Sequence, residues 1–317
     1  MSVHPLKRFL YHHTITVKIY NVIRNYRRDC RNCLSDEEFA QWMYAKHTGG
    51  KILDLKNPRT FDEKVWYLKL HERDALQTKC TDKYLVREYV QECGLGHILN
   101  EMYGVYDSFK EVPFDKLPER FFMKCTHTSG ANVIYDRNKT FDYIYYKNEF
   151  DYWMNRNYFW GSREYNYKDL EPKIICEQIL EDKNGKLPMD YKFMCFGGKV
   201  KMLFLNIGLA TEDGEHADDA FCNVYDRDFK FLPIKDEREN YLGNDIVKPD
   251  NWEQMIEYAE ILSKPFRHCR VDFYNVDGKI YFGEITFHHG GGCNGIEPEE
   301  WAYKMGEWIS IEGLDVG

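Results

Sequence analysis

Residues 269–286 read CRVDFYNVDGKIYFGEIT, and they form the most informative segment of the chain. Apolar and polar side chains alternate on both sides of Asp277-Gly278, a dipeptide that strongly favours a β-hairpin turn. We therefore predict two antiparallel strands, which belong to a final hairpin at residues 267–288.

The length of the turn determines which side chains share a face of this hairpin. If Asp277-Gly278 is a two-residue turn, Asp272 and Glu284 point to opposite faces. If Val276 joins the loop and Gly278 is left-handed, the two carboxylates share a face. In that second alternative the polar side chains of the hairpin all project together: Arg270, Asp272, Glu284 and Thr286.

Such a face suits Mg²⁺ that bridges the phosphates of a nucleotide, because carboxylate and hydroxyl oxygens favour a hard cation. Arg270 would offset the negative charge of the phosphates and keep the carboxylates ionised. The alternative is a surface hairpin whose acids and base form exposed ion pairs. The hairpin alone does not separate these alternatives.

A second candidate strand lies at residues 121–125 and carries Lys124 near its end, before a strand at 132–135. The loop between them reads THTSGAN and includes His127, Ser129 and Gly130. A lysine reaches phosphate oxygens as a point charge, and the N–H groups of a small-residue loop can fold over them. The alternative is an ordinary turn in which His127 has a structural role.

Two further strands complete the candidate site. The sequence KIICEQIL at residues 173–180 supplies apolar side chains and backbone groups that suit the edge of an adenine ring, although a buried strand reads the same way. Asp190 and Lys192 open the next strand on one face. The acid could hold ribose hydroxyls, and the lysine a phosphate.

The rest of the chain mixes helices with a meander of strands, which indicates an α+β fold without a regular βαβ alternation. Thr60 and Glu63 have capping-box spacing for a helix that continues to about His71. Further helices are predicted from Thr81 to Gly94, at residues 252–264 and at residues 298–311.

Charge is distributed unevenly along the 317 residues, whose formal net charge is −9. Residues 1–34 contain seven Lys/Arg and one acid, Asp29, so the rest of the chain carries −15. A body this acidic repels phosphate backbones, and we expect no nucleic-acid partner. Residues 6–31 could form an amphipathic helix on an anionic membrane surface or near a membrane-bound assembly complex. Alternatively, they form a basic helix packed on the rest of the protein.

Other features point to a cytoplasmic protein. No run of 18 apolar residues occurs, and the ten cysteines lack the spacing of a disulfide scaffold. The N-terminus has no secretory apolar segment or cleavage site. Cys30-x-x-Cys33 is not followed by a second pair or by histidines at zinc spacing, so we interpret it as a coincidence.

Taken in order, the candidate residues resemble the ATP-grasp superfamily: Lys124, Glu177, Asp190, Lys192, Arg270, Asp272, Glu284 and Thr286. Within it, five short motifs resemble the TupA-like branch, which is associated with bacterial surface-polysaccharide and teichuronopeptide biosynthesis: NPRTFDEK at 57–64, TDKY at 81–84, KCTHTSG at 124–130, DYKF at 190–193 and GEITF at 283–287. The resemblance covers roughly residues 40–310.

The resemblance implies an ATP-grasp fold in which two α+β subdomains grip ATP between them. We expect a basic helical extension at residues 1–55, a helical region at 56–115, a small subdomain at 116–180 and a large subdomain at 181–317.

The resemblance also implies roles for single residues. Lys124 and Lys192 would bind phosphates, with the loop of His127, Ser129 and Gly130 closing over the nucleotide, while Glu177 and Ile179 would lie at the adenine and Asp190 near the ribose. Arg270 would face the triphosphate and act in catalysis with Lys192, and Asp272 and Glu284 would hold Mg²⁺. Thr286 stands where most of the superfamily has an asparagine ligand, and the acceptor-site candidates that follow are His288, His289 and Gly291.

The implied reaction uses ATP and Mg²⁺ to join a carboxylate to an amine, with an amino acid or amino sugar added to a sugar carboxylate of a polysaccharide precursor. Three alternatives remain: a glycosyltransferase of polysaccharide assembly, an ATP-dependent glycan phosphotransferase, and a non-catalytic nucleotide-binding partner of the assembly machinery.

Overall fold

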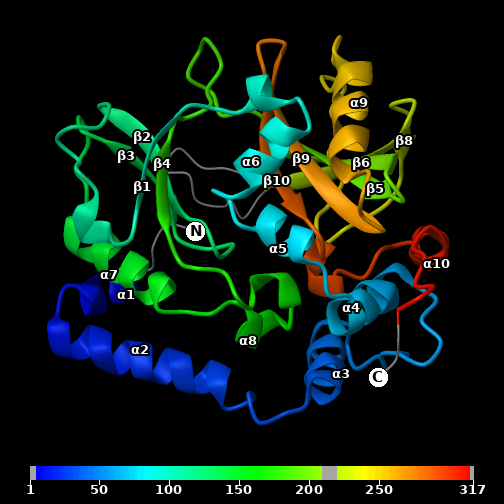
Figure 1. Cartoon of the computed structure of the whole chain (residues 1–317), viewed down its shortest axis with the longest axis horizontal. Helices are drawn as coiled ribbons and strands as arrows, with labels where there is room; N and C mark the ends of the chain where they lie inside the picture. The colour runs from blue at the N-terminus through cyan, green and yellow to red at the C-terminus, as the bar shows by residue number, and fades with distance from the viewer. Residues whose placement is uncertain (1–4, 209–219, 315–317) are drawn as a thin grey trace.

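The computed structural model describes residues 5–208 and 220–314 of the chain. Two antiparallel sheets lie side by side, with helices around them (Figure 1). The N-terminal helices are α1 (Pro5–Tyr11), α2 (Thr14–Asp29), α3 (Asp36–His47), α4 (Phe61–His71), α5 (Ala75–Thr81) and α6 (Val86–Glu92), before the short helix η1 (Gly96–Ile98).

The smaller sheet has four strands in the order β1-β4-β2-β3. Their bounds are Met102–Tyr106, Ile174–Glu177, Arg120–Cys125 and Asn132–Asp136, respectively. Helix α7 (Tyr143–Met154) packs on it through Phe150, which joins Phe109 and Phe121 in one apolar core. The short helices in this part of the chain are η2 (Phe109–Glu111), α8 (Phe159–Ser162) and η3 (Tyr165–Tyr167).

The larger sheet has six strands in the order β10-β9-β5-β6-β7-β8. In chain order these are β5 (Asp190–Phe196), β6 (Lys199–Ile207), β7 (Phe221–Asp226), β8 (Phe231–Leu232), β9 (His268–Val276) and β10 (Lys279–Thr286). Helix α9 (Trp252–Ser263) precedes the hairpin, and η4 (His289–Gly292) and α10 (Glu299–Glu307) follow it.

The two faces of the larger sheet have different environments. One face packs against α6 and α9 in the largest apolar core, where Phe193, Val271 and Trp252 are buried. Part of the other face packs against α4 and α10, as Phe61, Met194 and Met305 show. The remaining part of this second face carries polar side chains and faces the smaller sheet. These side chains line a cavity together with residues of the smaller sheet.

Several predicted elements are confirmed by the structure. Thr60 and Glu63 form the capping box of α4, which ends at His71 as expected. The strands β2 and β3, the helix α9 and the antiparallel hairpin also form where the sequence places them, which bears out the α+β class.

The helix predicted from Thr81 to Gly94 is wrong at its start. Helix α5 ends at Thr81, and the Asp82 carboxylate then accepts hydrogen bonds from the N–H groups of Tyr84 and Leu85 at 2.8 and 2.9 Å. A side chain that takes these N–H groups competes with helix formation, so residues 82–85 form a turn and α6 begins at Val86.

The basic N-terminal segment forms α1 and α2, which lie along the outer edge of the molecule beside α7 (Figure 1). Lys7 and Arg24 both pair with Glu149 of α7, at 3.0 and 3.2 Å, and Arg8 pairs with Asp142. Packing on the rest of the protein is therefore confirmed for part of this segment. Among the helices of residues 5–208 and 220–314, none has the length and apolar composition needed to cross a membrane.

Candidate active site

Three neighbouring strands of the larger sheet place charged side chains in one row. Lys192 of β5 is directly opposite Asp272 of β9, which is in turn opposite Glu284 of β10. Cross-strand partners of this kind have Cβ atoms roughly 5 Å apart. The row therefore brings together a lysine and two carboxylates that are up to 92 residues apart in the sequence.

The turn of the hairpin is the two-residue alternative, because Val276 pairs with Lys279, and Asp277 and Gly278 have φ values of 49° and 84°. Two positive φ values define a turn whose twist matches the strands. Gly278 therefore does not supply the longer loop that would place Asp272 and Glu284 on the same face.

A β-bulge at Gly283 instead brings the two carboxylates to the same face of the hairpin. Phe282 pairs with Phe273 and Glu284 pairs with Asp272, so Gly283 is the extra residue on β10. A Cβ atom on Gly283 would lie 3.0 Å from the carbonyl oxygen of Asp272, which is a tight contact. Since the bulge turns Glu284 to the face of Asp272, the predicted carboxylate pair forms by a different route.

Arg270 binds both carboxylates of the pair. Its Nε and Nη2 donate to the two oxygens of Asp272 at 2.7 and 2.6 Å, and Nη2 also donates to Glu284 Oε1 at 3.0 Å. Nη1 donates to His289 Nδ1 at 2.9 Å. Because arginine has only donors, that nitrogen accepts, so the ring proton is on Nε2 and is donated to Asp236 at 2.8 Å.

Lys192 lies between two carboxylates without a hydrogen bond to either. Its Nζ is 3.8 Å from Asp190 and 3.8 Å from Asp272, distances that allow attraction between charges but exceed hydrogen-bond length. Burial raises the pKa of Asp190, although Lys192 opposes this. The ammonium group therefore retains donors for a further anion.

The smaller sheet contributes the opposite wall. Lys124 of β2 pairs with Glu177 of β4 at 2.5 Å. Lys83, from the turn before α6, donates to the carbonyl of Thr128 at 2.7 Å. Burial alone would raise the pKa of Glu284, but Lys83, Arg270 and Lys192 outweigh it and lower that pKa to about 2.

A cavity of about 370 Å³ separates the two walls. Nine of the residues predicted from the sequence line it: Lys124, Ser129, Glu177, Ile179, Asp190, Lys192, Arg270, Asp272 and Glu284. Apolar side chains line another part: Phe122, Ile134, Leu180, Leu187, Pro188 and Phe282. A cavity with one apolar region and one cationic region matches a planar base attached to a polyphosphate.

Six predicted residues lie outside this cavity lining. His127 is buried, with Nε2 3.0 Å from the carbonyl of Trp153, and Gly130 packs so closely on the Trp153 ring that a Cβ atom would lie 2.5 Å from it. Thr286 donates to Glu284 Oε1 at 3.0 Å.

Of the acceptor-site candidates, His288 and His289 are buried, whereas Gly291 is partly exposed. His288 Nδ1 lies 3.3 Å from Glu164, and His289 bridges Arg270 and Asp236 as described above. The carbonyl of Gly291 accepts from Lys69 Nζ at 2.9 Å.

Sequence reasoning gave no role to several residues that line the cavity. Lys83 belongs to the motif TDKY, which was noted without a function, and Arg87 donates to Asn100 at 2.9 Å near the exit of β4. Tyr274 also lines the cavity, and the charge of Asp190 together with burial raises its pKa well above the usual value. The alternation of β9 could have identified Tyr274, because it shares a face with Asp272.

The carboxylate pair fits a magnesium ion that is shared with phosphate oxygens. Glu284 Oε2 has no hydrogen-bond partner among the described residues, while the oxygens of Asp272 accept only from Arg270. Within those residues, no group of three or more His, Cys, Asp or Glu side chains is placed to hold a metal ion. Mg²⁺ commonly uses one or two carboxylates and completes its shell with water and phosphate, so two carboxylates suffice.

Two antiparallel sheets that enclose a cavity between a lysine wall and a carboxylate hairpin define an ATP-grasp protein. The sequence model described as "TupA-like ATPgrasp" matches residues 63–310, which is most of the chain. The chain belongs to the TupA-like ATP-grasp family, as the motifs predicted. ATP-grasp enzymes bind ATP, and the superfamily consists largely of carboxylate–amine ligases.

The solved structures that match this chain are distant from it in sequence. The L-amino acid ligase from Bacillus licheniformis shares 12% identity, with a TM-score of 0.46 over 82% of this chain and 56% of that chain. The D-alanine–D-alanine ligase from Bacillus anthracis shares 15% identity, with a TM-score of 0.40 over 66% of this chain and 57% of that chain. The chain thus spans little more than half the length of these two relatives. No curated protein shows significant similarity to it.

Proposed function

We propose that this chain is an ATP- and Mg²⁺-dependent carboxylate–amine ligase in bacterial surface-polysaccharide or capsule biosynthesis. The observation that carries this proposal is the cavity between the sheets, which joins an apolar region to a region with five cationic side chains: Lys83, Arg87, Lys124, Lys192 and Arg270. Family membership supports ATP as the nucleotide.

The adenine is assigned to the apolar region near the end of β4. Ile179 and Leu180 line the cavity, and their backbone groups form no hydrogen bond with the described parts of the chain. Free backbone donors and acceptors beside apolar side chains are suited to the edge and faces of a purine. Asp190, which also lines the cavity, is assigned to the ribose hydroxyls.

The polyphosphate is assigned to the cationic region. Lys124 and Lys192 bind phosphate oxygens from opposite walls, and Asp272 and Glu284 hold magnesium. Magnesium, when bound, neutralises negative charge on the phosphates. Arg270 keeps both carboxylates oriented and ionised, and it also stabilises negative charge on the group being transferred.

The chemistry needs no protein nucleophile. A substrate carboxylate oxygen bonds to the γ-phosphorus, the bond from that phosphorus to the ADP oxygen breaks, and ADP leaves. An amine nitrogen then bonds to the acyl carbon, the bond from that carbon to the phosphate oxygen breaks, and the nitrogen loses a proton. Alignment and charge stabilisation by Lys192 and Arg270 are the main contributions of the protein.

The proposed substrates are a sugar carboxylate of a polysaccharide precursor and the amine of an amino acid or amino sugar. The basis is the association of the TupA-like branch with surface-polysaccharide assembly. His288, His289 and Gly291 are proposed to form the acceptor side, because His289 contacts Arg270 from the side away from Asp272.

The test combines ADP release with mass spectrometry. The protein is incubated with ATP, Mg²⁺, a uronic-acid oligosaccharide and a mixture of amino acids, and we expect an amide product. Asp272→Asn and Glu284→Gln should each lower ADP release by at least about 100-fold. Sustained ADP release by both variants would contradict the metal assignment.

Other products would identify the alternatives. Phosphate retained on the glycan would indicate a phosphotransferase, and sugar transfer from a nucleotide sugar would indicate a glycosyltransferase. Thermal stabilisation by ATP, but not by UDP-, GDP- or CMP-sugars, is expected for the ligase. Tight ATP binding without turnover under any acceptor would point to a non-catalytic partner.

A further inference from the structure

Helix α2 is amphipathic, yet most of its large apolar side chains face solvent instead of the protein. An amphipathic helix of a globular protein normally buries its apolar stripe. Here a continuous stripe of large apolar side chains remains in solvent, with exposed fractions between 48% and 75%: Ile15, Ile19, Val22, Ile23 and Tyr26. Phe9 of the preceding helix α1 is also exposed, with an exposed fraction of 60%.

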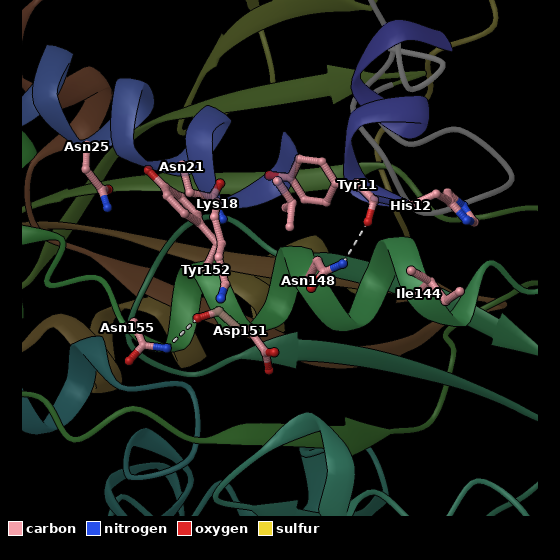
Figure 2. A pocket seen from close by; sticks show the side chains of 11 residues that line it. Tyr11, His12, Lys18, Asn21, Asn25, Ile144, Asn148, Asp151, Tyr152 and Asn155 are labelled. Atoms are coloured by element: carbon pink, nitrogen blue, oxygen red, sulfur yellow. Dashed lines mark hydrogen bonds between the residues drawn. The ribbon is translucent and has the colours of Figure 1, made fainter. Parts of the chain in front are cut away.

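The inner side of α2 is largely polar. A pocket of about 480 Å³ lies between α2 and α7, and Lys18, Asn21 and Asn25 of α2 line it (Figure 2). Arg24 pairs with Glu149 and lies over the ring of Tyr152 at 3.8 Å, while Val17 is the one buried apolar side chain of the described part of α2 and packs with Tyr11 and Tyr145. These contacts fix α2 on α7 with its apolar stripe directed outward.

The charge of this region is positive, although the remainder of the chain is acidic. Seven Lys/Arg residues and one acid occur in residues 1–34, against a formal −15 for the rest. Bases still outnumber acids by seven to three when two acids that pair with this segment are counted, namely Asp142, the N-cap residue of α7, and Glu149 of α7. An apolar stripe in a basic segment matches the interface of an anionic bilayer, which accepts apolar side chains and attracts cations.

We propose that α2 docks this protein on anionic phospholipid membranes through the stripe formed by Ile15, Ile19, Val22, Ile23 and Tyr26. The helix lies at the outer edge of the molecule, so it can lie in the plane of a bilayer without blocking the space between the two sheets (Figure 1). The docking is independent of the chemistry proposed above and brings a cavity for ATP close to the membrane surface.

The experiment is sedimentation of the full chain with vesicles of phosphatidylcholine alone, or of equal parts phosphatidylcholine and phosphatidylglycerol. The test variant is Ile19→Glu/Val22→Glu. The matched control is Ile52→Glu/Val247→Glu, which places the same charges at apolar side chains that are 84% and 77% exposed but lie outside α2. ATP binding, followed by thermal shift, checks that each variant is folded.

We expect the wild type and the control to bind the anionic vesicles, and the stripe variant to bind more than about tenfold more weakly. Binding should weaken at high salt, because ionic strength screens the charges. Equal binding to both vesicle types, or no binding to either, would overturn the proposal. So would a dimer, detected by light scattering, that Ile19→Glu/Val22→Glu dissociates, because the stripe would then pair with a second copy.

Discussion

The two walls of the cavity hold their charges in different ways. On the smaller sheet, Lys124 and Glu177 form one ion pair between neighbouring strands. On the larger sheet, Arg270 alone binds Asp272, Glu284 and His289, and His289 extends the network to Asp236. The smaller sheet therefore contributes an ion pair, and the larger sheet contributes a hydrogen-bonded network centred on the guanidinium of Arg270.

This difference determines how each wall responds to substitution. Removing one member of a buried ion pair leaves one uncompensated charge, and removing its partner as well eliminates the problem. Removing the centre of a network leaves several groups without a partner, which no single second substitution repairs. The Arg270 wall should therefore behave as a unit, and the Lys124 wall as two separable residues.

The largest effect is expected for Arg270→Met. Asp272 is 5% exposed and would lose both of its hydrogen bonds, so the variant should lose about 3–5 kcal/mol of unfolding free energy. ATP turnover should fall at least about 100-fold, because the carboxylates also lose their orientation. Urea unfolding and ADP release measure the two effects.

The matched comparison is a pair of double variants. Lys124→Met/Glu177→Gln should recover most of the stability that Lys124→Met loses. Arg270→Met/Asp272→Asn should recover little, since Glu284 and His289 still lack the hydrogen bonds that Arg270 donates to them. Equal recovery in the two double variants would show that the walls do not differ in this way.

An intermediate effect is expected for a substitution at the bulge that orients Glu284 toward Arg270. Gly283→Val would place a Cβ atom 3.0 Å from the Asp272 carbonyl and 3.2 Å from the Tyr274 ring, and it should displace Glu284. Because a shift of roughly 1 Å in a site can cost 100-fold in rate, we expect ADP release to fall more than about tenfold.

The control for the bulge is the turn of the same hairpin. Gly278→Ala meets no atom within 4 Å, and its cost is the left-handed φ of 84°, roughly 1 kcal/mol of stability. Turnover should stay near the wild-type value. If Gly278→Ala instead reduced turnover as much as Gly283→Val, the turn and not the bulge would orient Glu284.

The hairpin also shows how far the sequence could be interpreted. Alternation and Asp277-Gly278 predicted the strands and the turn residues, and the polar side chains of β9 were identified correctly as one face. The prediction that a longer turn places Asp272 and Glu284 on one face was wrong. A bulge at Gly283 turns Glu284 to the face of Asp272 without any change in the turn. Gly283 inside a strand was an available signal, since an isolated glycine there often marks a bulge.

Long-range partners were the part that the sequence could not supply. Lys83 is 201 residues from Glu284, and no local pattern connects a turn between two short helices with the last strand of a sheet. Gly130 illustrates the opposite case, in which a residue chosen for a flexible loop is glycine because the Trp153 ring occupies the space of a Cβ atom. Such packing depends on the fold and is not encoded in a local motif.

The smallest effect is expected where the two walls act on each other across the cavity. Lys83 is held by the loop of the smaller sheet, yet among the cations that lower the pKa of Glu284 it has the largest influence. In the folded wild type Glu284 therefore titrates at about 2, whereas an unfolded glutamate titrates near roughly 4.3. The resulting stability is fully present above the unfolded pKa and is lost as the pH falls toward 2.

Lys83→Met should raise the pKa of Glu284 in the folded protein and so reduce its difference from the pKa in the unfolded chain. The free energy of unfolding should then fall less steeply for Lys83→Met than for the wild type as the pH is lowered from about 4.3 toward 2. The effect is modest, because the Glu284 side chain is 40% exposed and water screens part of the interaction. Lys230→Met, an exposed site away from the cavity, should keep the wild-type slope. A wild-type slope in Lys83→Met as well would show that Arg270 and Lys192 set the charge of Glu284 from their own wall, and that the two walls are electrostatically independent.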